Sequence, residues 1–79
     1  MDLITSTISH EMRNPLNSII SQCKIQEQNL INLKNSMREK GINDRVLTNI
    51  INEMQESVAI QITSSNLLLY HVEDILGIS

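Results

Sequence analysis

The chain lacks most of the residues that build β-rich folds and aromatic cores. It has no Trp, no Phe and a single Tyr, Tyr70. Two glycines and one proline in 79 residues are too few for a small all-β fold, which needs a turn about every 8–12 residues. The 41% of hydrophobic residues must therefore form a core of Ile, Leu, Val and Met. This composition predicts an all-α fold in one small domain spanning residues 1–79.

Several partners and settings are also not expected. Six Lys and Arg against nine Asp and Glu give a net charge of −3, and the basic residues are scattered, so we expect no nucleic-acid partner. The longest apolar run, Leu67-Leu68-Leu69, is far shorter than the roughly 20 residues that span a bilayer. We expect no direct membrane insertion, although a larger parent protein could be anchored. The lone cysteine, Cys23, cannot form an internal disulfide and indicates a buried thiol in a reducing, cytoplasmic setting.

Two stretches carry the heptad repeat of long amphipathic helices. With Leu16 at position a, the first has Leu16, Cys23, Leu30 and Met37 at a, and Met12, Ile19, Gln26 and Leu33 at d. The second has Ile51, Val58 and Val72 at a, and Leu47, Met54, Leu68 and Ile75 at d, with interruptions at Gln61 and Ser65. The pattern predicts helices over about 2–40 and 44–77.

A short turn separates the two helices, at about residues 41–43. Gly41 can adopt the left-handed conformation that ends a helix, and Asn43 or Asp44 can cap the next one. The apolar stripes are wider than one partner helix can cover, because Ile8 and Ile20 extend the first stripe. We therefore expect a long antiparallel hairpin that forms a homodimer, a four-helix bundle. The alternative is a monomeric hairpin covered by a different protein.

One segment is not explained by bundle building: Ser9-His10-Glu11-Met12-Arg13-Asn14-Pro15-Leu16. Pro15 interrupts a strong helical pattern, which costs about 3 kcal/mol in an ordinary helix interior. On the heptad, His10 and Glu11 fall at b and c, on the solvent side. A zinc-protease motif would need a second His four residues after His10, but that residue is Asn14, so we expect no metal site.

The heptapeptide from His10 to Leu16 resembles the H-box of sensor histidine kinases, in their dimerisation and histidine-phosphotransfer domain. The resemblance extends over both helices and includes the stretch from Ser65 to Leu76, but it departs from the family pattern at Gly77. It implies that His10 accepts the γ-phosphoryl group of ATP on Nε2 and passes it to an aspartate of a response-regulator receiver domain.

The resemblance also implies roles for two neighbours of His10. Glu11 is similar to the family's acidic residue that acts as general base and orients the imidazole through Nδ1. Asn14 is similar to the polar residue that orients a water molecule when the phosphorylated receiver is hydrolysed. Pro15 resembles a residue at which the helix can bend. His71 lacks these neighbours and is expected to be a bystander.

The chain holds no phosphate-binding glycine loop, since Gly41 and Gly77 both fall at helix ends. No cofactor is expected in the chain itself, and the resemblance implies that ATP and Mg²⁺ come through a separate catalytic domain of the same parent. Alone, the chain is expected neither to bind ATP nor to phosphorylate itself. Two other functions stay open: a structural hairpin without chemistry, and a stand-alone phosphotransfer protein, for which Met12-Arg13-Asn14 is a poor match.

Overall fold

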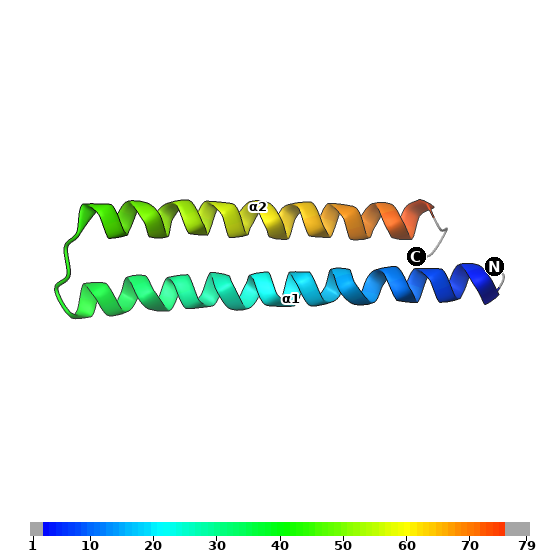
Figure 1. Ribbon diagram of the computed structural model, residues 1–79, viewed down its shortest axis with the longest axis horizontal. Helices are drawn as coiled ribbons and strands as arrows, with labels where there is room; N and C mark the ends of the chain where they lie inside the picture. Colours follow the sequence, from blue (N-terminus) through cyan, green and yellow to red (C-terminus); the bar gives the residue numbers. More distant parts are fainter. Residues whose placement is uncertain (1–2, 76–79) are drawn as a thin grey trace.

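The chain forms a helical hairpin, which confirms the predicted all-α class. The computed structural model describes the backbone of residues 3–75, and the side chains of that range except residues 3–6 and 9. Helix α1 spans Leu3–Glu39 and helix α2 spans Arg45–Ile75, and residues 3–75 contain no strand. The helices run antiparallel and side by side in a rod with extents of 59 × 15 × 15 Å (Figure 1). The first turn of α1 therefore lies at the same end as the last turn of α2.

The sequence predicted helices over about 2–40 and 44–77. In the structure the first helix ends at Glu39 and the second begins at Arg45. Residue 2 and residues 76–77 lie outside the described residues, and so does the departure from the family pattern at Gly77. Helix α1 continues through Pro15 without interruption. The proline therefore does not divide the helix, although it cannot donate a backbone hydrogen bond at its own position.

Gly41 ends α1 in a Schellman motif. Its φ of 67° is the left-handed conformation expected from the sequence, and this prediction is confirmed. The amide of Ile42 donates to the carbonyl of Met37 at 2.9 Å, and the amide of Gly41 donates to the carbonyl of Arg38 at 3.2 Å. Two carbonyl groups at the helix end are satisfied in this way, and the chain reverses direction immediately.

Asp44 begins α2 as its N-cap residue. The amide of Leu47 donates to Asp44 Oδ1 at 3.1 Å, which satisfies one of the free amides of the first turn. The hydroxyl of Thr48 donates to the backbone carbonyl of Asp44 at 2.8 Å. Of the two capping residues that the sequence left open, the structure selects Asp44.

The a positions of both helices form the packing inside the hairpin. All four a residues of α1 from Leu16 to Met37 are buried, as are the three apolar a residues of α2 and Ile20 at position e of α1. The main cluster consists of Cys23, Leu30, Met37, Ile51 and Val58, with Ile62 packed against it. Cys23 is 5% exposed, which confirms the predicted buried thiol.

The d positions remain open in the single hairpin. We call this surface the d stripe, and its members are Met12, Ile19, Gln26 and Leu33 on α1, and Leu47, Met54, Gln61, Leu68 and Ile75 on α2. Its apolar members are between 43% and 79% exposed. The heptad pattern predicted one apolar seam made of both a and d positions. In the hairpin, the two helices bury the a residues of that seam and leave its d residues exposed. This exposed stripe is the surface that a further helix pair would have to cover.

Candidate functional site

The three residues singled out by the sequence lie together on the open side of α1. His10, Glu11 and Asn14 are all exposed. His10 and Asn14 are four residues apart on a continuous helix, so they lie one above the other on the same face. The imidazole and the side-chain amide are thus presented to solvent on the same face, and the heptad had predicted this exposure for His10.

Glu11 takes a different direction from the helix, about 100° around its axis from His10. Within the described residues, no hydrogen bond joins His10 to Glu11. The contact through Nδ1 that the resemblance implies would therefore require a change of side-chain rotamer.

Buried and charged contacts hold this segment against α2. Leu16, the last residue of the heptapeptide, is buried at 9% exposure, whereas Pro15 beside it is exposed. Arg13 Nε lies 3.5 Å from Glu73 Oε1 on α2, with the two side chains 25% and 36% exposed. The Arg13 Nε atom is itself buried and makes no hydrogen bond, so the ion pair is loose and contributes at most about 1 kcal/mol.

Glu73 is a neighbour of the candidate site that sequence reasoning missed. Its partner Arg13 belongs to the heptapeptide, but the pairing depends on how the two helices are aligned across the turn. The only signal in the sequence is the length of the connection between residues 39 and 45, which sets this alignment once both helix ends are known. The pair links the segment that carries His10 to the last turns of α2.

His71 lies near the same end of the hairpin but in different surroundings. It is exposed on α2, and its ring lies 5.9 Å from that of Tyr70 at an interplanar angle of 65°. This is an edge-to-face pair of aromatic rings. Neither of its neighbours offers the Glu, Asn and Pro sequence that follows His10.

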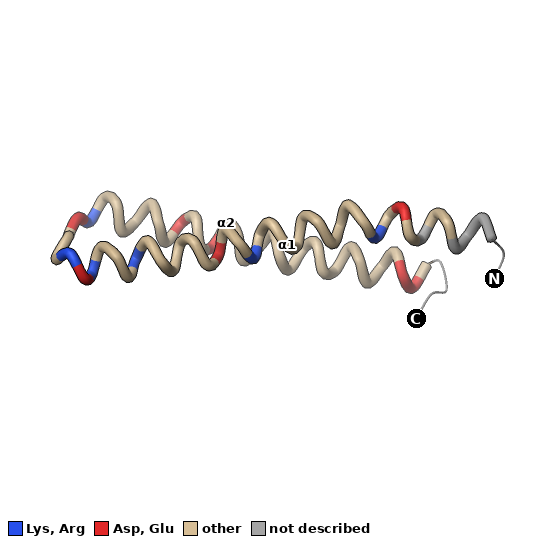
Figure 2. The backbone as a smooth tube through the Cα atoms, turned by 90° about the horizontal axis from the view of Figure 1, so that it is seen from below, with Lys and Arg blue, Asp and Glu red and all other residues tan. Residues whose placement is uncertain are grey.

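Charged residues are absent from two facing stretches beyond the candidate site. Residues 14–23 of α1 and 57–72 of α2 contain no Lys, Arg, Asp or Glu, and Figure 2 shows them as tan lengths of the tube without blue or red. The surface from Asn14 toward the middle of the rod is therefore neutral.

The described residues contain neither a metal-binding cluster nor a membrane-spanning helix. Among the described residues, no three His, Cys, Asp or Glu side chains gather where they could hold a metal ion. Neither α1 nor α2, over their described lengths, has the hydropathy needed to cross a bilayer.

The described residues thus form a two-helix hairpin that presents an exposed histidine close to exposed Glu and Asn side chains on its first helix. Comparison with protein families gives a match to the His Kinase A (phospho-acceptor) domain over residues 1–79. The chain belongs to this family, as the resemblance indicated. No curated protein and no solved structure matches it significantly. Domains of the family serve phosphoacceptor and dimerisation roles in histidine kinases and work with kinase domains.

Proposed function

We propose that His10 is the phosphoacceptor of a sensor or hybrid histidine kinase in a two-component system. It would receive the γ-phosphoryl group of ATP from the catalytic domain of the same parent and pass it to an aspartate of a response-regulator receiver domain. ATP and Mg²⁺ would be held by that catalytic domain. The observation that carries the proposal is the solvent-exposed His10-Glu11 pair, within a chain that matches the phosphoacceptor family over its whole length.

The transfer to His10 is a displacement at phosphorus. The lone pair of Nε2 forms a bond to the γ-phosphorus, while the bond from phosphorus to the β-γ bridging oxygen breaks and ADP leaves. Nδ1 must carry the ring proton at the start, and that proton passes to Glu11 or to water as the phosphoramidate forms. Transfer to the receiver reverses this chemistry: the N–P bond breaks, an O–P bond to the aspartate forms, and the ring regains its proton.

Asn14 supports a further step, the hydrolysis of the phosphorylated receiver. Its amide can both donate and accept a hydrogen bond, which is what orienting a water molecule requires. It lies one helical turn from His10 on the same exposed face. A receiver docked with its aspartate at His10 would therefore also come within reach of Asn14.

A homodimer completes the proposal. The d stripe contains no charged residue, and its apolar side chains are between 43% and 79% exposed in the single hairpin. Packing two d stripes against each other would bury them in a four-helix bundle. We also place the domain in the cytoplasm, where ATP and receiver domains are found together.

The test uses two matched histidine variants of the parent kinase. His10→Gln removes the nucleophile while keeping a polar side chain, and His71→Gln makes the same change on the exposed surface of α2. We expect acid-labile, base-stable phosphate on the wild-type protein and on His71→Gln, and none on His10→Gln. Phosphate on His10→Gln would overturn the assignment.

The competing function is a structural hairpin that dimerises a parent protein without chemistry. Dimerisation alone gives no reason for an interior proline beside an exposed His-Glu pair. The same assay separates the two functions, because a purely structural hairpin would carry no acid-labile phosphate in any variant.

A further inference from the structure

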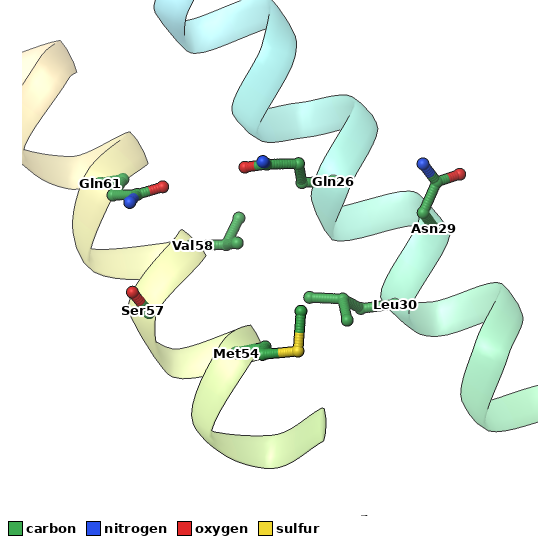
Figure 3. A pocket seen from close by; sticks show the side chains of 7 residues that line it. All are labelled: Gln26, Asn29, Leu30, Met54, Ser57, Val58 and Gln61. Atoms are coloured by element: carbon green, nitrogen blue, oxygen red, sulfur yellow. The ribbon is translucent and has the colours of Figure 1, made fainter. Parts of the chain in front are cut away.

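Within the d stripe, one level differs from the rest. Gln26 on α1 and Gln61 on α2 are the only polar members of the stripe. Figure 3 shows their side chains pointing toward one another from the two helices. Between them opens a groove of about 320 Å³, whose walls also include Leu30, Met54 and Val58. We call Gln26 and Gln61 the glutamine level.

Apolar levels lie on both sides of the glutamine level. Because the helices are antiparallel, one heptad toward the His10 end brings Ile19 of α1 to the level of Leu68 of α2. One heptad toward the turn brings Leu33 to the level of Met54. These four side chains are all between 46% and 51% exposed. The stripe is therefore an apolar strip with a single polar band across it.

The hydrogen-bonding capacity of this band is largely unused within one hairpin. The Cys23 thiol donates to Gln61 Oε1 at 3.6 Å, which ties the Gln61 side chain to the hairpin core. No hydrogen bond within the described residues uses Gln61 Nε2 or the side-chain amide of Gln26. In the single chain water can reach these exposed groups, but a partner that covers the d stripe would displace that water.

We propose that the glutamine level fixes the register in which two copies of this chain pair. The inference rests on the homodimer proposed above and names what makes the two copies fit. A glutamine amide donates and accepts, so the four amides of two aligned copies can satisfy one another in a single layer. A slip of one heptad would place amides against Ile19 and Leu68, or against Leu33 and Met54, and leave them buried without partners.

Because the glutamine amides need hydrogen-bond partners once they are covered, a second copy of the chain is the best occupant of the d stripe. The stripe is uncharged, although the chain as a whole carries a net charge of −3, so two stripes can approach without direct charge repulsion. A partner with apolar residues at this level would bury the amides without hydrogen-bond partners. Another copy of the chain supplies matching amides at the same level. Single polar layers of this kind set register in coiled coils at some cost in stability.

The experiment is a mixing assay between wild-type chain and the double variant Gln26→Met, Gln61→Met. Methionine keeps the approximate size of glutamine and removes its hydrogen bonds. The two proteins carry different fluorescent labels, are mixed in equal amounts and are brought to exchange equilibrium. Random pairing would give mixed dimers as half of the total. In the mixed dimer the wild-type amides are buried without hydrogen-bond partners. We therefore expect its association constant to fall at least about tenfold below the mean association constant of the two homodimers.

Gln28→Met is the matched control. Gln28 lies on the outer face of α1, where its amide bonds only to Asn32 on the same helix, at 3.0 Å. We expect this variant to mix randomly with the wild type. If the methionine pair fails to form its own dimer, the double leucine variant Gln26→Leu, Gln61→Leu takes its place in the same assay.

Random mixing of the glutamine-level variant with the wild type would overturn the inference while leaving the homodimer intact. A wild-type chain that stays monomeric would instead refute the homodimer, and this inference with it. Neither outcome affects phosphorylation of His10, which the histidine variants test separately.

Discussion

Truncating Leu68 separates packing between two hairpins from packing within one. Leu68 lies on the d stripe and is 51% exposed in the single hairpin. Full burial of a leucine side chain contributes about 1.5–3 kcal/mol, so covering the exposed half contributes about 1 kcal/mol. Each dimer contains two copies, and Leu68→Ala should therefore weaken it by about 2 kcal/mol, or roughly 30-fold in the dimer Kd.

The assay is sedimentation equilibrium over a concentration series, with helix content followed by circular dichroism. Ile60→Ala is the matched control, because Ile60 is similarly exposed at 59% but lies on the outer face of α2, away from the d stripe. We expect Ile60→Ala to leave the dimer Kd unchanged. Leu30→Ala, in the hairpin core, should instead lower the stability of the hairpin itself by about 2–5 kcal/mol.

Two results would refute this reasoning. An unchanged dimer Kd for Leu68→Ala would mean that the d stripe is not the dimer surface. An equal loss in Leu68→Ala and Ile60→Ala would mean that association follows exposed apolar area in general rather than this stripe.

Three further predictions concern the turn and the surface beside His10. Gly41→Ala should destabilise the hairpin by about 1–2 kcal/mol through its backbone conformation alone, since an added Cβ meets nothing within 4 Å, and urea unfolding measures this. Asp44→Ala should cost about 1 kcal/mol in the same assay, while Asp44→Asn should retain most of the stability. Ser21→Arg and Ile25→Asp, on the exposed face of α1 beyond His10, should each slow phosphoryl transfer to the cognate receiver without changing the dimer Kd; unchanged rates in both would place the docking surface elsewhere.

The sequence predicted the helices and the hairpin core well because both depend on local pattern. Heptad spacing alone places Cys23 and Val58 on buried faces, and both are buried. Heptad spacing could not distinguish the a positions, which are buried within the hairpin, from the d positions, which are exposed. Which of the a and d positions faces the neighbouring helix depends on how the turn at Gly41 rotates α2 about its axis, and that rotation is a three-dimensional property.

The candidate site divides in the same way. The solvent exposure of His10 and Glu11 follows from heptad position, and the structure places both as predicted. The Arg13–Glu73 pair does not follow, because it joins residues 60 positions apart whose alignment depends on the whole length of both helices. Features of the site that come from one helix face were predictable, and those that need the register across the hairpin were not.

Packing along the hairpin is graded, and the gradient suits a phosphoacceptor. The contiguous buried cluster lies toward the turn, between Cys23 and Val58, where three side chains of α1 pack with two of α2. Toward His10, the buried residues are Leu16, Ile20 and Val72, which lie outside that cluster, and the loose ion pair at Arg13 links the segment that carries His10 to α2. Segments with few buried contacts open at lower free energy than the core. The half of the rod near the turn can thus hold the fold while the His10 end adjusts, as the proposed transfer from a catalytic domain and on to a receiver would require.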